Sequence, residues 1–185
     1  MKIDDGSKVI RKAIKFAEDK HQGQVRKLSG SPYIHHPLMV SYVAANFKKS
    51  KNLYKLIAAA ILHDVIEDTN ASPEEIAKEF GKLISSLVFE LSDDKEEIAR
   101  VGKLEYQKAK WPGLSNYGLF LKLCDRYCNI LDDAGEKYIT DTSIIISGLK
   151  KKRRLTGSQR SILREIEKII KASKQKKEPT SANTL

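Results

Sequence analysis

The sequence predicts an all-α fold, and three observations lead to it. Apolar residues recur at helical spacing in most segments of the chain. Glycine and proline are few, 10 and 5 in 185 residues, whereas a sandwich or barrel would need many turns. No segment reads convincingly as a strand, although "TSIIISG" at 142–148 has the composition of one. With 185 residues and a hydrophobic fraction of 41%, the chain is long enough to close one hydrophobic core.

Three helices are expected in the N-terminal part of the chain. Residues 7–21 place their apolar side chains on one side of a helix. The segment 22–37, rich in Gly, Ser and Pro, predicts a loop, and its final proline begins a second helix over about 37–46. A third helix is expected over about 52–68.

The middle of the chain contains a signal for the start of another helix. "SPEE" at 72–75 combines a capping serine, proline at the first helical position and glutamate at the third. This helix is expected to end before Gly81, since glycine commonly follows the last residue of a helix. Further helical segments are expected at 82–91, 95–111 and 115–133.

The net charge of +10 is concentrated at the C-terminal end. Residues 150–185 contain twelve Lys or Arg and three Glu, which leaves 22 basic and 21 acidic residues in the first 149. We therefore expect a main domain at 1–149, a basic helix at 150–172 that packs on it, and a disordered polar tail at 173–185. The basic side chains are either a solvated face or a surface for RNA, the ribosome or another polyanion. The apolar residues of this helix at helical spacing are Ile162, Leu163, Ile166, Ile169 and Ile170.

The sequence also predicts a cytoplasmic location. The first residues, "MKIDDGSKVI", lack the apolar core of a signal peptide, and no run approaches the ~20 apolar residues of a membrane span. The two cysteines, Cys124 and Cys128, fall four residues apart in a helical pattern and do not form a paired framework. This usage fits a reducing compartment. A zinc finger is not expected, since there is no CxxC motif.

The stretch "ILHDVIEDT" at 61–69 crowds ionisable residues onto the end of an apolar segment. In a continuous helix, His63 and Glu67 share one face, and Asp64 and Asp68 lie on the adjoining one. Acids near a buried segment are costly to ionise unless a cation or hydrogen-bond donors compensate them. The alternative is that Glu67 and Asp68 face water while His63 is a core histidine.

Two further segments favour a metal site. "YIHHP" supplies His35 and His36, and "LKLCDRYCN" supplies Asp125 with Asn129 one helical turn later. One histidine of this loop, Asp125 and the His63–Asp64 pair together form a set of two imidazole and two carboxylate ligands. Such a set suits Mn²⁺, Fe²⁺ or Zn²⁺ better than Ca²⁺, and four protein ligands leave positions open for water and substrate.

Five motifs follow one another along the chain: "HQGQVRK", "PYIHHP", "AAAILHDVIEDT", "EEIAKEFG" and "LKLCDRYCNI". In this order they resemble the HD-type hydrolase domain of the RelA/SpoT homologues. They cover roughly His21 to Leu131, and the chain length is similar to that of the small alarmone hydrolases in this family. The resemblance implies that residues 1–149 are an HD-type hydrolase domain, folded as an HD helical bundle. It also implies Mn²⁺-dependent hydrolysis of guanosine tetra- or pentaphosphate, (p)ppGpp, with one ion per site and release of the 3′-diphosphate as pyrophosphate.

The resemblance also implies roles for individual residues. The family's metal ligands correspond to His36, His63, Asp64 and Asp125. The acidic pair that positions or activates the attacking water corresponds to Glu67 and Asp68. The residues that contact the substrate correspond to Arg26, Lys27 and Asn129, the first two at its phosphates. A carboxylate near a metal can accept a proton from water, and an arginine with a lysine can offset the charge of a phosphoryl group.

The sequence departs from the family's pattern at several points. The loop before His36 is about one residue longer than the common form, and His35 is an additional histidine, interpreted as a surface residue. Cys124 replaces the usual alanine and is interpreted as a small buried thiol. Little is recognisable after Asp133, and with no room for a nucleotidyltransferase domain, alarmone synthesis is not expected.

Four further side chains near these motifs have two interpretations each. Tyr33 and Tyr127 either pack in the core or stack on the guanine base. Lys122 and Arg126, which flank Asp125, are interpreted as solvated charges, with contact to a substrate phosphate as the alternative.

Three classes of function follow. The first is the (p)ppGpp hydrolase, whose binding partner is the guanosine nucleotide substrate. We expect no interaction with a membrane. Nucleic acid could bind only through the basic C-terminal segment. The second is an HD metal phosphohydrolase that acts on another nucleotide, for instance the 2′-phosphate of NADPH. The third is a non-catalytic binding module, such as the neutralising half of a toxin pair. A binding module has no chemical need for all six metal-site and acidic residues, which favours an enzyme.

Overall fold

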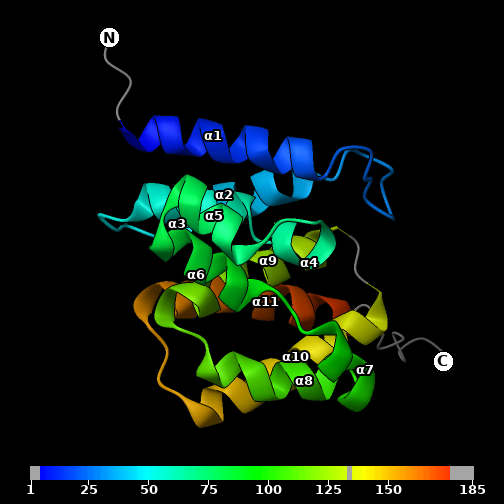
Figure 1. Cartoon of the computed structure of the whole chain (residues 1–185). Coiled ribbons are helices and arrows are strands. Elements are labelled where there is room, and N and C mark those ends of the chain that lie inside the picture. The colour runs from blue at the N-terminus through cyan, green and yellow to red at the C-terminus, as the bar shows by residue number, and fades with distance from the viewer. Residues whose placement is uncertain (1–4, 133–134, 176–185) are drawn as a thin grey trace, which may run out of the picture.

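The computed structural model describes residues 5–132 and 135–175, and most of them are helical (Figure 1). Within these ranges, strand pairing is limited to one isolated bridge between Val25 and Pro32. The predicted all-α fold is thus confirmed. The strand-like segment 142–148 lies inside the helix α10, Glu136–Lys152, so its run of isoleucines serves helix packing.

Helix α3 lies at the centre of the N-terminal half. It packs against α1, α2 and α6, and three of its residues, Ala58, Ala59 and Ala60, are fully buried. Their small side chains allow the neighbouring helices to approach closely. The elements of this half are α1 (Asp5–Lys20), α2 (His35–Phe47), α3 (Leu53–Ile61), α4 (Val65–Asp68), α5 (Pro73–Phe80) and α6 (Lys82–Leu91).

The single helix predicted over 52–68 is wrong. The structure divides it into α3 and α4, with a turn at residues 62–64. Asp64 has φ −100° and ψ −4°, a conformation that interrupts the helix. His63 therefore sits in the turn between two helices, and the facial relationship with Glu67 that a continuous helix would give does not apply.

Two glycines end helices in the middle of the chain. Gly81 and Gly102 have φ of 86° and 84°, values that favour glycine. Gly81 separates α5 from α6, as predicted, and Ser72 caps α5 by accepting a hydrogen bond from the Glu75 N–H at 3.2 Å. Gly102 divides the segment 95–111, which the sequence presented as one element. The elements of this half are α7 (Lys95–Val101), α8 (Lys103–Lys110), the 3₁₀ turn η1 (Trp111–Gly113), α9 (Asn116–Leu131), α10 and α11 (Gly157–Gln175).

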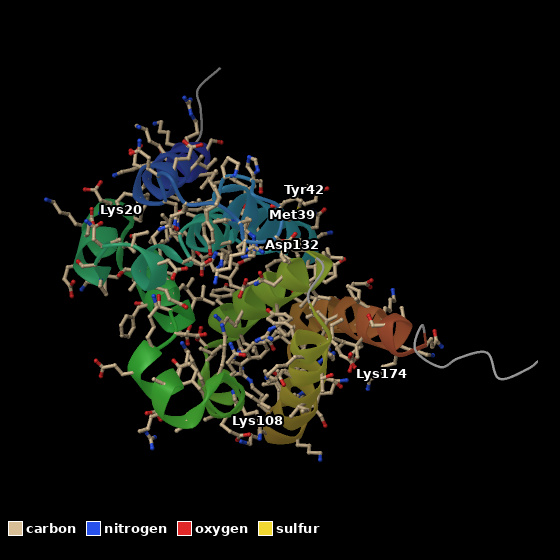
Figure 2. The ribbon with its side chains drawn as sticks, turned by 90° about the vertical axis from the view of Figure 1, so that its right-hand side faces the viewer. Lys20, Met39, Tyr42, Lys108, Asp132 and Lys174 are labelled. Atoms are coloured by element: carbon tan, nitrogen blue, oxygen red, sulfur yellow. The ribbon has the colours of Figure 1, made fainter. Side chains whose placement is uncertain are left out.

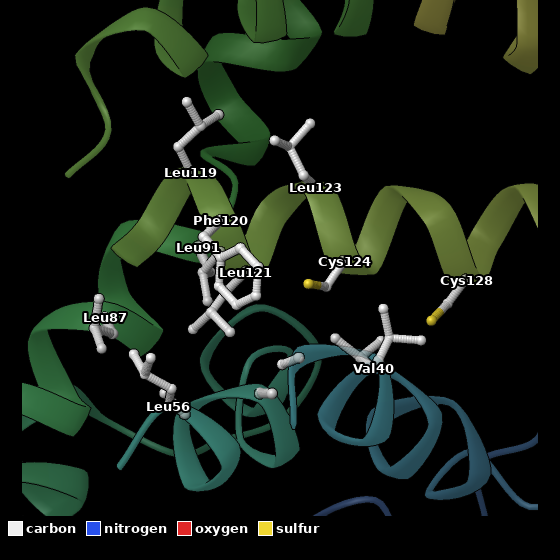
Figure 3. Close-up of a cluster of buried hydrophobic side chains, with 14 of the residues drawn as sticks. Val40, Leu56, Leu87, Leu91, Leu119, Phe120, Leu121, Leu123, Cys124 and Cys128 are labelled. Atoms are coloured by element: carbon white, nitrogen blue, oxygen red, sulfur yellow. The ribbon is translucent and has the colours of Figure 1, made fainter. Parts of the chain in front are cut away.

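Helix α9 is buried on two sides, which explains its nearly continuous apolar sequence. Leu119 and Leu123 project from one side, while Cys124 and Cys128 point to the other, toward Val40 of α2 (Figure 3). Both thiols are buried and unpaired. Burial raises the pKa of each thiol, that of Cys128 to about 12. The predicted small buried thiol at Cys124 is confirmed.

Helix α2 is apolar on most of its surface but only 13 residues long. One side packs on α3 and α9, while Met39 and Tyr42 point outward and are 52% and 66% exposed (Figure 2). No helix among residues 5–132 and 135–175 has the length and apolar character needed to cross a bilayer.

Helix α11 lies against α9 and α10 through its apolar side. Ile162, Leu163, Ile166 and Ile170 are buried, whereas the lysines and arginines of the helix face solvent or lie at its edges. The bounds expected for the basic helix, 150–172, are wrong: residues 150–152 end α10, α11 begins at Gly157, and it continues to Gln175. The remainder of the predicted polar tail, 176–185, lies outside the described residues.

Because Ile166 is 0% exposed, truncating it should create a cavity between α11 and the main domain. We expect Ile166→Ala to lower the free energy of unfolding by about 2–5 kcal/mol. Chemical denaturation followed by circular dichroism measures this change. Lys168→Ala on the exposed side of the same helix should shift it by at most about 0.5 kcal/mol. Equal effects of the two substitutions would show that α11 does not share the core.

Candidate metal centre and its cleft

His63 occupies the turn between α3 and α4, and its surroundings fix its tautomer. The ring is 2% exposed, and Nδ1 lies 2.7 Å from the carbonyl oxygen of Ala60. A peptide oxygen only accepts hydrogen bonds, so Nδ1 must carry the proton. This leaves Nε2 as the atom that can take up a cation, either a proton or a metal ion. The carbonyls of the last helical turn lack partners within the helix, which is why one is available to His63.

Three side chains from separate elements meet at this Nε2 atom. His36, in the first turn of α2, places Nε2 3.2 Å from Oδ1 of Asp125 on α9, and His63 Nε2 lies 3.7 Å from the same oxygen. The potential ligand atoms of the three residues all lie within 4.8 Å of one another. Adjacent ligands of an octahedral ion, at about 2.1 Å from the metal, would be about 3 Å apart. The spacing therefore suits one ion.

Asp64, the fourth predicted ligand, lies beside this trio. Its Oδ2 is 2.9 Å from His63 Nε2 and accepts a 2.5 Å hydrogen bond from the hydroxyl of Tyr33. Burial alone would raise the pKa of Asp64, but His63 and the Tyr33 hydroxyl lower it well below its ordinary value. Tyr33 thus orients one oxygen of Asp64, as outer residues commonly orient a metal-binding group.

The donor set fits a divalent cation on two observations. Burial lowers the pKa of His63, but Asp64 and Asp125 outweigh it and raise this pKa to about 10, so the carboxylates draw a positive charge onto this ring when no metal is bound. In addition, His63 Nε2 is buried and lacks an aligned hydrogen-bond partner among the described residues, despite the carboxylate at 2.9 Å. A metal ion placed among these atoms would replace the proton on Nε2 and neutralise the carboxylates.

The acidic pair Glu67 and Asp68 follows on α4, and the two residues differ. Glu67 is partly buried, and its Oε2 accepts a 2.9 Å hydrogen bond from the backbone N–H of Asp93. Burial raises its pKa above the ordinary value. Asp68 is exposed and lies 3.4 Å from the ammonium of Lys95. Glu67 is therefore the better placed of the two to accept a proton near neutral pH.

The interpretation of Lys122 as a solvated charge is wrong. Its side chain is 6% exposed, and Nζ donates to the Leu91 carbonyl at 3.1 Å. The same ammonium lies 3.7 Å from Asp93 and 3.9 Å from Asp125. Burial lowers its pKa, but the carboxylates outweigh burial and raise it. Lys122 therefore remains charged and links the Asp93 turn to the candidate ligand Asp125.

The same interpretation is wrong for Arg126, which is 3% exposed. Its guanidinium lies 4.9 Å from the ring of Trp111 and 4.4 Å from the ring of Tyr138. It donates to the side-chain oxygen of Gln107 at 2.5 Å and to the hydroxyl of Thr142 at 3.1 Å. The sequence predicted no such burial, because charged side chains on a helix are ordinarily solvated.

Two of the predicted substrate-binding residues are joined to the centre by hydrogen bonds. Arg26 donates to Asn129 at 3.0 Å and to Asp132 at 2.6 Å, and Asn129 donates to Asp125 at 2.5 Å. Lys27, next to Arg26 in the loop between α1 and α2, is exposed. The loop is tied by a hydrogen bond from the Arg26 N–H to the Ser31 carbonyl at 2.8 Å.

Most of the candidate site residues line one cleft of about 880 Å³. It is lined by every predicted site residue except His63, which is buried. His35 is exposed and does not line the cleft, and Tyr127 packs against Phe47 with ring centroids 6.5 Å apart. The lining residues are Gln24, Val25, Arg26, Lys27, Leu28, Tyr33, His36, Asp64, Glu67, Asp68, Asp93, Lys103, Gln107, Lys122, Asp125, Arg126, Asn129 and Tyr138.

Sequence reasoning missed one side of this cleft. Lys103, Gln107 and Tyr138 come from α8 and α10, which no recognised motif covers. Asp93 was also missed, although its backbone holds Glu67. The cluster of Trp111 and basic residues at the end of 95–111 was the available signal, but nothing in the sequence places it beside Asp125.

The HD domain family matches residues 13–112 of the chain. A protein of Xenopus tropicalis named guanosine-3′,5′-bis(diphosphate) 3′-pyrophosphohydrolase MESH1 is 34% identical over 125 residues, which cover 67% of this chain and 69% of the relative. A Borreliella burgdorferi protein named guanosine-3′,5′-bis(diphosphate) 3′-pyrophosphohydrolase is 51% identical over 81 residues, 44% of this chain. The Escherichia coli bifunctional (p)ppGpp synthase/hydrolase SpoT is 34% identical over 139 residues, 69% of this chain.

The chain spans only a small part of these two bacterial relatives, 12% of the Borreliella protein and 18% of the Escherichia coli protein. A solved structure described as a metazoan ortholog of SpoT that hydrolyzes ppGpp superposes with a TM-score of 0.76. The superposition covers 94% of this chain and 98% of that one at 22% identity. This likeness extends the shared fold to nearly the whole chain, including helices beyond the family match.

Proposed function

This chain belongs to the HD domain family, and from its candidate site we propose that it hydrolyses guanosine tetra- or pentaphosphate. The reaction would transfer the 3′-diphosphate to water and leave GDP or GTP with pyrophosphate. The observation that carries the proposal is the convergence of His36, His63 and Asp125 within 4.8 Å of one another, in a cleft that also presents Glu67 and Arg26. Relatives named as 3′-pyrophosphohydrolases support this choice of substrate.

The residues proposed to hold one divalent ion are His36, His63, Asp64 and Asp125. We propose Mn²⁺, because two imidazoles with carboxylates suit a transition-metal ion better than Ca²⁺. When bound, this ion would polarise a phosphoryl oxygen and lower the pKa of a coordinated water. A cytoplasmic location remains part of the proposal, in line with two unpaired buried thiols.

The protein side chains would transfer the proton, position the attacking water and neutralise the charge of the diphosphate. Glu67 accepts the proton of the attacking water, helped by its raised pKa, and Asp68 positions that water from the same turn. The water oxygen bonds to the phosphorus attached to O3′ of the ribose, the P–O3′ bond breaks, and O3′ takes up a proton. Arg26 and Lys27 neutralise the diphosphate, with Arg26 suited to two parallel hydrogen bonds. Asn129 is hydrogen-bonded to both Arg26 and Asp125 and so fixes the position of each relative to the other.

A turnover assay on a panel of nucleotides tests the proposal. The purified chain is incubated with Mn²⁺, with Zn²⁺ or with chelator, and pyrophosphate and orthophosphate are measured separately. We expect metal-dependent release of intact pyrophosphate from ppGpp and pppGpp. Release of orthophosphate from NADPH, without turnover of ppGpp, would instead support a phosphohydrolase of another nucleotide. No turnover of any nucleotide would support a binding module.

A further inference from the structure

The charged residues that are exposed on α11 are all basic. They recur at intervals of three or four residues, so they form one row along the side of the helix that faces away from the main domain. At about 1.5 Å per residue, the row is roughly 21 Å long. Its members on α11 are Arg160, Arg164, Lys168, Lys171 and Lys174.

One further cation extends this basic row at its start. Arg154 lies in the connection between α10 and α11 and is exposed. It lines the same surface hollow as Arg160. The basic row is therefore defined as Arg154 together with the five exposed cations of α11.

Almost nothing neutralises the basic row. Residues 150–175 contain ten Lys or Arg and only two Glu. Glu165 lies 2.9 Å from Lys168 of the row, while Glu167 pairs with Lys150, which is outside it. Within the described part of the chain, the other five cations of the row have no ion pair. The row thus keeps most of its positive charge available to a partner.

The basic row is also separate from the candidate metal centre. None of its residues lines the cleft that contains Glu67 and Asp125. The first 149 residues are nearly neutral, with 22 basic and 21 acidic residues, so the row does not belong to a generally positive surface. Hydrolysis of a nucleotide in the cleft gives this row no task. A surface with charges of one sign attracts polyanions.

The surroundings of the basic row favour one class of polyanion. A helix that lies on a membrane buries its apolar face in lipid, but the apolar face of α11 packs against α9 and α10. Single-stranded nucleic acid is commonly held by aromatic side chains on which its bases stack, and residues 150–175 contain no aromatic residue. A duplex keeps its bases stacked inside and presents regularly spaced phosphates, which Lys and Arg contact directly.

We propose that the basic row binds the phosphate backbone of double-stranded nucleic acid without preference for base sequence. The arginines form paired hydrogen bonds with phosphate oxygens, and the lysines act as point charges. RNA and DNA duplexes share this chemistry. The proposal is independent of the hydrolysis proposed above, because the row lies outside the cleft.

Fluorescence anisotropy of a labelled duplex of about 20 base pairs, titrated with the whole chain at about 50–200 mM salt, tests the proposal. We expect the row variant to bind at least about tenfold more weakly at the lowest salt, and the slope of log K against log salt to become shallower by about 2–3. A control variant loses the same charge from exposed side chains of α1 and should bind within about twofold of wild type. The two triple variants are Arg160→Gln/Arg164→Gln/Lys171→Gln in the row and Lys8→Gln/Arg11→Gln/Lys15→Gln on α1.

RNA and DNA duplexes are titrated separately, and tighter binding of one identifies the source of the phosphates. Absence of duplex binding by the wild type, or equal weakening in both triple variants, would overturn the proposal. Tighter binding to vesicles of phosphatidylcholine and phosphatidylglycerol than to either duplex would assign the row to a membrane instead. A row variant with unchanged duplex binding but a lower kcat/KM for ppGpp would show that the row attracts the substrate. Thermal unfolding should be the same in all three proteins, since every replaced side chain is exposed.

Discussion

Replacing Asp125 by alanine is expected to release the metal ion and to lower the rate of hydrolysis by more than about 10², since loss of even an outer partner of a metal ligand costs 10–100-fold. Asp125 Oδ1 is 3.2 Å from His36 and 3.7 Å from His63, so it is the atom common to both imidazoles. Its loss leaves two neutral imidazoles and Asp64, a set with one carboxylate fewer that binds a divalent ion more weakly. Elemental analysis after dialysis and the pyrophosphate assay measure the two effects.

A matched acid elsewhere on the molecule serves as the control for this substitution. Asp19 lies on α1 with a side chain that is 64% exposed, paired with Lys15 at 3.1 Å. Asp19→Ala should retain the metal content and rate of the wild type. His63→Ala should resemble Asp125→Ala. Full metal occupancy in both site variants would contradict the proposed ligand set.

The structure explains why the order of helices was predictable while the shape of the centre was not. Ser72, Pro73 and Gly81 give local signals for the ends of α5, and local signals suffice there. The turn at His63 has none, since "LIAAAILHDVIED" contains no glycine or proline. Only the packing of α3 and α4 against their neighbours, together with the His63 bond to Ala60, stabilises the interruption.

The same reasoning applies to the cations near the centre. Lys122 and Arg126 are three residues before and one after Asp125, and a charged residue at such positions is ordinarily solvated. Arg126 is buried because residues of α8 and α10 contact it, and Lys122 is buried against Leu91 and Asp93 at the end of α6. Sequence alone predicts neither contact. By contrast, His36, His63 and Asp125 were identified as a set because only their chemical types, and not their surroundings, were needed.

Replacing Glu67 by glutamine is expected to keep the metal ion and to lower kcat by about 10²–10⁴, the usual effect of removing a general base. Glutamine can still accept the hydrogen bond from the Asp93 N–H, so the local geometry should persist. Glu67 does not belong to the trio of close ligand atoms, which is why metal content should not change. Glu18→Gln on the exposed part of α1 is the control. A wild-type rate in Glu67→Gln would mean that Glu67 plays no part in proton transfer.

The pH dependence of Glu67→Gln separates a catalytic carboxylate from a structural one. Because burial raises the pKa of Glu67 above 4.5, the wild-type rate should begin to fall, as the pH is lowered, at a higher pH than an ordinary glutamate would give. The variant should lack this acidic limb of the rate profile.

Ionisation of Glu67 favours the reaction but opposes folding. The folded chain binds the Glu67 proton more tightly than the unfolded chain, so this group favours folding at low pH, and the benefit is lost as the pH rises through the raised pKa. Ionised Glu67 therefore costs stability at neutral pH. In chelator at pH 7, Glu67→Gln should unfold at the same or a higher temperature than the wild type, with a smaller difference near pH 4. A structural carboxylate would instead give a variant that is less stable at pH 7.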